Sequence, residues 1–216
     1  MTHPVRRITL TLLASAGWSV SFLFSRSIYE PLALFGLGMT LLAFRQEQKP
    51  LLHLLRPQPR HLLLGVVAGV ILVGVTYLMT PMVAQIPLIR DELLAMMTRM
   101  RVMNSVPVAA VLTAWIIFVE ELIWRGLITL PDTFGRLEST PLLPLFLSST
   151  LYALAQLGSG SAVLVGIALV FGLIWGTLRS LTGSLITPLV CHLIWDLCVL
   201  GLWPVDRLFP EVFKVG

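Results

Sequence analysis

The chain has 216 residues, of which 56% are hydrophobic and only 12% charged, and its mean hydropathy is +0.90. About a quarter of the residues of a soluble globular protein are charged, so a soluble domain is excluded. The apolar runs predict an all-α, polytopic transmembrane bundle, because lipid cannot satisfy the polar groups of an irregular backbone. The runs are also too continuous for an alternating β-barrel. The net charge of +4 fits basic loops that set membrane orientation, and no nucleic-acid partner is expected.

Hydrophobic segments along the chain predict about seven spans. They lie near residues 8–25, 31–45, 62–83, 107–130, 141–157, 162–178 and 184–203. The second and fifth segments are short for a full crossing, so tilt and partial insertion both stay open. The first segment continues beyond Ala14-Ser15-Ala16, and we interpret it as an uncleaved span.

Two polar segments separate the spans. Residues 45–61 are basic and contain proline, which predicts a connecting loop and favours a cytoplasmic N-terminus. Residues 86–106 mix charged side chains with leucine and methionine. This amphipathic pattern predicts an interfacial helix lying along the membrane, or a lid or access ramp beside a site.

The fourth predicted span contains ionisable residues in apolar surroundings. Glu121 and Arg125 are four residues apart and share a helical face, which favours an ion pair. Glu120 points about a hundred degrees away, at 3.6 residues per turn, with no partner of opposite charge on its own helix. Charges at bilayer depth usually serve a function, because each destabilises the span. The alternative is a cluster at the end of a helix among lipid headgroups.

The seventh predicted span contains His192 and Asp196, again four apart on one face. Alone, this pair is typical of a buried histidine oriented by a carboxylate. Beside the glutamates of the fourth span, it predicts one shared polar cavity.

Other chemistries receive less support from the sequence. Zinc is disfavoured and no cofactor is expected, because His3, His53 and His61 fall in terminal or loop segments, which leaves His192 with carboxylates. Cys191 and Cys198 fit the use of cysteine as a small hydrophobe. The serines Ser148, Ser149 and Ser184 have no evident base beside them.

The motifs resemble those of the CPBP family, the CAAX-protease and bacteriocin-processing intramembrane endopeptidases, also called Abi proteins. Glu120-Glu121-xxx-Arg125 is followed, in matching order and separation, by the segments 148–160 and 171–196. The resemblance covers roughly residues 95–203. It implies domain ranges of 1–90 for N-terminal spans and basic loop, 91–206 for the protease core and 207–216 for a short tail.

The resemblance implies a glutamate-dependent protease in a bacterial or archaeal cell membrane, acting on a peptide or membrane-anchored protein. Glu120 would activate water, and Glu121 and Arg125 would shape and charge-balance the cavity. His192 and Asp196, the latter in place of the commoner Asn, would stabilise the oxyanion.

One departure from the family pattern bears on activity. Family members usually carry Phe-xxx-His in the fifth span, and the matching residues here are Tyr152 and Gln156. A glutamine can position water but cannot accept a proton. The alternative is therefore a catalytically impaired member that binds membrane peptides or proteins as a regulator or chaperone. A transporter or channel is a third class, disfavoured because the sequence shows no inverted repeat.

Overall fold

The computed structural model describes residues 3–24, 29–101, 106–130, 133 and 142–213, and every regular element in these ranges is helical. The all-α prediction is confirmed. The predicted segment ends at residues 25 and 141, and residues 102–105 of the amphipathic segment, lie outside the described ranges.

Helices occupy all seven predicted hydrophobic segments and most of the segment 86–106. They are α1 (His3–Ser21), α2 (Tyr29–Leu54), α3 (Pro59–Val83), α4 (Pro87–Met100), α5 (Val106–Glu120), the π-helix η1 (Glu121–Leu127), α6 (Leu142–Ala155), the 3₁₀ turn η3 (Gln156–Ser159), α7 (Ala162–Thr182), α8 (Ile186–Asp196), the π-helix η4 (Leu197–Leu202), α9 (Val205–Leu208) and α10 (Pro210–Phe213). Four stretches are long and apolar enough to cross a membrane: Pro59–Val83, Pro107–Leu127, Leu142–Ser159 and Ala162–Thr182. The total of about seven spans, and the interfacial position of α4, stay predictions.

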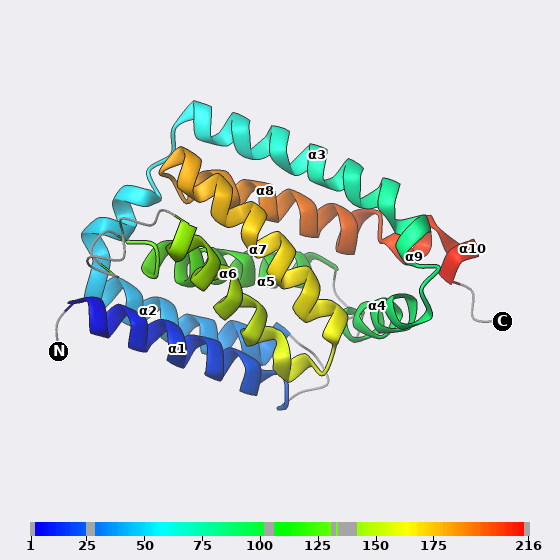
Figure 1. The fold of residues 1–216 in the computed structure, drawn as a ribbon, viewed down its shortest axis with the longest axis horizontal. Coiled ribbons are helices and arrows are strands. Elements are labelled where there is room, and N and C mark those ends of the chain that lie inside the picture. Colours follow the sequence, from blue (N-terminus) through cyan, green and yellow to red (C-terminus); the bar gives the residue numbers. More distant parts are fainter. Residues whose placement is uncertain (1–2, 25–28, 102–105, 131–132, 134–141, 214–216) are drawn as a thin grey trace.

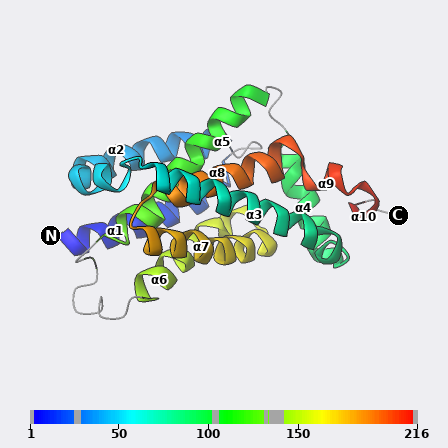
Figure 2. The same ribbon diagram turned by 90° about the horizontal axis from the view of Figure 1, so that it is seen from above.

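The helices form a bundle in which α5 is central. Figure 1 shows α1 and α2 along one side, α3 and α8 along the opposite side, and α5, α6 and α7 between them. Helix α3 packs along α8, α6 along α7, and α2 along α5. Figure 2 shows α4, α9 and α10 together at the end nearest the C-terminus, with the N-terminus at the far end. The helices that carry the predicted site residues therefore meet inside the bundle.

The predicted loop 45–61 is wrong for most of its length. Helix α2 continues through it to Leu54, with non-helical backbone angles at Glu47, and only residues 55–58 lie outside a helix. The Arg7 guanidinium donates two hydrogen bonds to the Glu47 carboxylate, at 2.8 and 2.9 Å, and both side chains are buried. A buried bidentate pair of this kind ties α1 to α2 where α2 bends.

Helix α4 is attached to the bundle by polar contacts at both ends. The Glu92 carboxylate accepts hydrogen bonds from the Ser161 hydroxyl and the Val163 backbone N–H at the start of α7. These two bonds favour the ionised form and hold the pKa of Glu92 below its ordinary value. At the other end, Arg101 donates to both oxygens of Asp206 in α9, at 2.6 and 2.7 Å.

Two pairs of glycines four residues apart, Gly65 with Gly69 and Gly172 with Gly176, lie at close helix contacts. A Cβ atom placed on Gly65 would lie 2.8 Å from the Thr187 backbone oxygen in α8. One placed on Gly176 would lie 2.4 Å from Leu145 in α6. Small residues let backbones approach, so α3 rests directly against the helix that carries His192.

Candidate active site

The two helices that bear the acidic and histidine motifs change their winding at the site. Helix α5 ends at Glu120, and the wider π-helix η1 begins at the next residue. Helix α8 ends at Asp196, and the π-helix η4 follows it directly. Single π turns are rare and occur frequently at functional sites. Both wide turns begin where a carboxylate faces the interior of the bundle.

Glu120 is buried and has neighbours on two other helices. Its Oε2 accepts a hydrogen bond of 2.8 Å from the Tyr152 hydroxyl of α6, and the same oxygen lies 3.8 Å from His192 Nε2. The Gln156 side chain lies beside the same carboxylate, one turn after Tyr152. The partners that Glu120 lacks on its own helix are therefore supplied by α6, η3 and α8.

His192 has a carboxylate on each side of its ring. Nδ1 lies 2.9 Å from Glu121 Oε1, and Nε2 lies 3.5 Å from Asp196 Oδ1. The ring stacks on Trp175 of α7, with centroids 3.4 Å apart and planes at 18°. Glu121 thus fixes Nδ1 as the donating nitrogen, and Nε2 faces Asp196 and Glu120.

Arg125 lies behind these residues and is fully buried. Its Nη1 is 3.4 Å from Glu121 Oε1, which is the ion pair that the spacing predicts, although the intervening turn is a π-helix. The guanidinium stands 4.3 Å from the Tyr152 ring centroid and 5.4 Å from that of Trp175. Contacts of this kind stabilise a buried cation. A chain of contacts therefore leads from Arg125 through Glu121 to His192.

The polar residues line one part of a cavity of about 800 Å³, a size usual for ligand sites. Glu120, Gln156, His192 and Asp196 all reach this cavity, whereas Glu121 and Arg125 are not among its lining residues. The lining is otherwise largely apolar, with side chains from α3, α4 and α7. Helix α4 contributes three methionines: Met96, Met97 and Met100. The cavity therefore joins a small polar centre to a larger apolar space.

The structure brings all six predicted site residues together. Four lie on the cavity wall, and the ion pair lies directly behind it. Glu120, Glu121 and Arg125 are buried inside the protein, at 6, 1 and 0% exposure. This burial does not fit the alternative of a charge cluster exposed among headgroups. The functions of the six residues stay predictions.

Two contributors were not predicted. The Tyr152 hydroxyl, which the Phe of the family pattern lacks, donates to Glu120. Trp175 carries no charge, so no pattern in the sequence singles it out as a site residue, yet its ring stacks on the His192 ring. Tyr152 and Gln156 are four residues apart, and this spacing is the feature of the sequence that indicates that both side chains face the same partner.

Other nucleophiles have structural partners. The Ser148 hydroxyl donates to the Trp124 backbone oxygen, and Ser149 donates to that of Leu145 at 2.8 Å. Ser184 lies 3.4 Å from the backbone oxygen of Leu54. Both cysteines are free thiols.

His53 and His61 do not join the site. His53 lies in α2 and His61 in α3, so their predicted placement in loops is wrong. The side chain of His3 lies outside the described residues. In the described ranges, no group of three or more His, Cys, Asp and Glu side chains is arranged to hold a metal ion. The expectation that no cofactor is needed stays a prediction.

Comparison with known proteins locates this site within one family. Residues 102–198 match the family model of the type II CAAX prenyl endopeptidases, Rce1-like. The match confirms the resemblance drawn from the sequence, and this Rce1-like segment includes all six predicted site residues. Neither the curated proteins nor the solved structures provided a match. The Rce1-like match and the apolar helices indicate an integral membrane protein.

Proposed function

We propose that the protein is an intramembrane glutamate endopeptidase that cleaves a peptide or a membrane-anchored protein. The observation that carries the proposal is the convergence of Glu120 and Asp196 on His192, within 3.8 and 3.5 Å, at the wall of one cavity. A carboxylate placed in such dry surroundings is a suitable general base for water. The Rce1-like match supports the same reaction class.

In the proposed reaction, Glu120 takes a proton from water as the water oxygen attacks the scissile carbonyl carbon. For this step His192 carries a proton on both ring nitrogens, so that Nδ1–H donates to Glu121 and Nε2–H donates to the oxyanion of the tetrahedral intermediate. The C–N bond then breaks, and Glu120 returns its proton to the leaving amine. Asp196 acts by orienting His192 from 3.5 Å. The pair of Glu121 and Arg125 holds the other side of the ring through Nδ1.

The alternative is a family member without peptidase activity that uses the same cavity to bind a membrane peptide or protein. Gln156 favours it, because an amide beside Glu120 cannot relay a proton. The apolar lining and the three methionines of α4 suit a hydrophobic segment in either case.

The test is cleavage of a broad library of hydrophobic peptides and lipid-anchored peptides by the purified protein in lipid. Glu120→Gln keeps the size of the side chain and removes the base, so product formation is expected to fall at least a hundredfold, in the range of a lost general base. Equal cleavage by the wild type and Glu120→Gln contradicts the proposal. In the same assay, cleavage gained only with Gln156→His supports the alternative, whereas robust wild-type cleavage that this variant does not increase supports a working glutamine site.

A further inference from the structure

We propose that Tyr152 is a positioning residue of this site, whose hydroxyl orients the Glu120 carboxylate for proton transfer. The proposal rests on the peptidase function above and adds a residue to it. It arises from one contact, the hydrogen bond of 2.8 Å from the Tyr152 hydroxyl to Glu120 Oε2. This bond holds the carboxylate in one orientation, from which it can take the proton from water.

The surroundings of Tyr152 fix its hydroxyl in place. The ring is buried and lies 5.3 Å from the Trp124 ring centroid on one side and 6.3 Å from that of Trp175 on another. The Arg125 guanidinium covers its face at 4.3 Å. A donor held by its neighbours loses little entropy when it binds the carboxylate, which is the condition for an effective oriented hydrogen bond.

The cation also strengthens the donor. A positive charge over the ring withdraws electron density from the phenol and favours donation of its proton to an anion. Arg125 therefore acts on both carboxylates of the motif, on Glu121 at 3.4 Å and on Glu120 through the Tyr152 ring. This arrangement explains why the cation lies behind the cavity wall and not on it.

Packing alone does not account for the hydroxyl. The ring contacts with Trp124, Trp175 and Arg125 would all be kept by phenylalanine. The hydroxyl adds one interaction, the bond to Glu120. Tyr152 and Gln156 lie one turn apart and both reach this carboxylate, so two neutral groups hold the base.

The experiment compares wild type with Tyr152→Phe. We expect kcat to fall roughly ten- to a hundredfold, as for a lost hydrogen bond to a charged group, with KM changed less than about twofold. The acidic limb of the pH profile of kcat/KM should also move to higher pH, because the ionised carboxylate has lost a donor.

The matched control is Tyr77→Phe. In the described structure the Tyr77 hydroxyl donates only to the backbone oxygens of Cys198 and Trp203, and Tyr77 does not line the cavity. Tyr77→Phe should leave the acidic limb of the pH profile unchanged.

A second measurement does not depend on activity. The carbonyl band of the protonated Glu120 carboxyl can be followed by infrared titration and assigned by its loss in Glu120→Gln. In Tyr152→Phe, protonation should occur at higher pH than in wild type. An unchanged titration, or an unchanged kcat and pH limb while Glu120→Gln is inactive, overturns the assignment of Tyr152 and leaves the peptidase proposal intact. Cleavage that is equal in wild type and Glu120→Gln refutes the peptidase instead, and the infrared result then decides whether Tyr152 holds Glu120.

Discussion

At the scale of single residues, the site depends on a cation that no water can reach. Arg125 is fully buried, and in the described ranges none of its guanidinium nitrogens has a hydrogen-bond partner. Its charge is stabilised by Glu121 at 3.4 Å and by the Tyr152 and Trp175 rings. An arrangement of this kind tolerates the loss of both charges better than the loss of one.

The corresponding prediction concerns Arg125→Met. Removal of the cation leaves Glu121 as a buried anion beside His192, so we expect a loss of about 3–5 kcal/mol in the free energy of unfolding. The double variant Glu121→Gln/Arg125→Met should recover much of this stability. Unfolding in detergent micelles measures the effect, with Arg90→Met as the control, because Arg90 is partly exposed and, among the described residues, is paired only with its neighbour Asp91. A double variant no more stable than the single one would show that the charge pair is not the cause.

At the scale of elements, α3 determines how closely α8 is held. Gly65 and Gly69 of α3 face Thr187, Val190 and Ile194 of α8, so there is no space for even a methyl group at Gly65. Helix α8 carries His192 and Asp196, and any outward shift of α3 changes the support behind them.

We therefore expect Gly65→Ala to destabilise the protein by about 1–3 kcal/mol, the usual effect of overpacking. The new Cβ would lie 2.8 Å from both the Thr187 oxygen and Val190 Cβ. Gly74→Ala in the same helix is the matched control, since a Cβ there meets nothing within 4 Å. It should be neutral or stabilising by up to about 1 kcal/mol, from helix propensity alone. Thermal unfolding and peptidase rate in lipid measure both variants, and equal behaviour of the two would refute the contact as described.

Some of the helices and contacts can be predicted from the sequence, and others cannot. The apolar runs predict the helices well, because hydrophobicity over some twenty residues is a strong signal. The extension of α2 through residues 45–54 was missed, since its charges and Pro50 are typical of loops, and the buried partner Arg7 is 40 residues away. The i,i+4 spacing predicts the Glu121–Arg125 pair, but neither the π-helical turns nor the bond from Tyr152 to Glu120 follows from spacing.

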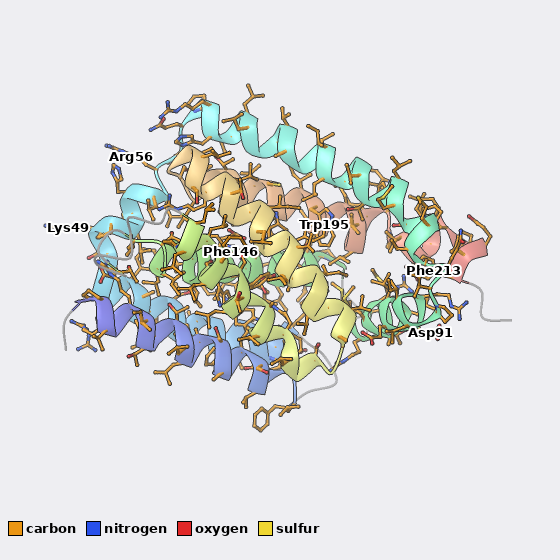
Figure 3. The ribbon with its side chains drawn as sticks, in the orientation of Figure 1. Lys49, Arg56, Asp91, Phe146, Trp195 and Phe213 are labelled. Atoms are coloured by element: carbon orange, nitrogen blue, oxygen red, sulfur yellow. The ribbon has the colours of Figure 1, made fainter. Side chains whose placement is uncertain are left out.

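At the scale of the whole molecule, charge is distributed unevenly along the bundle. Lys49 and Arg56 lie at the end that holds the N-terminus, and Asp91 lies at the opposite end (Figure 3). Arg6 and Arg7 lie near the start of α1, Arg45 and Glu47 in α2 close to Lys49, Arg60 at the start of α3 and Arg179 in the last turn of α7. The helices at the second end carry both signs: α4 has Arg90, Asp91, Glu92 and Arg99, α9 has Asp206 and Arg207, and α10 has Glu211. The excess of Lys and Arg at the first end favours its placement in the cytoplasm.

The prediction is that the two ends lie on opposite sides of the membrane. In a variant without Cys191 and Cys198, a single cysteine introduced as Arg56→Cys should resist a membrane-impermeant maleimide added to intact cells. One introduced as Arg207→Cys should react. Labelling of both positions after cell lysis controls for accessibility. The reverse pattern would place the N-terminus outside, and labelling of neither in intact cells would require both ends to lie in the cytoplasm.

The two π-helical turns have a consequence for any attempt to graft these site residues onto another protein. A π turn holds one residue more than the α turn that it replaces, so every side chain beyond it is rotated relative to an ideal helix. The segment Glu120–Arg125 crosses such a turn, and η4 begins directly after Asp196. Copying the motif residues onto straight helices of a designed bundle would reproduce their order but not their directions. A working graft would have to include the extra residue in the helix that carries Glu120 and Arg125, whereas His192 and Asp196 both precede η4.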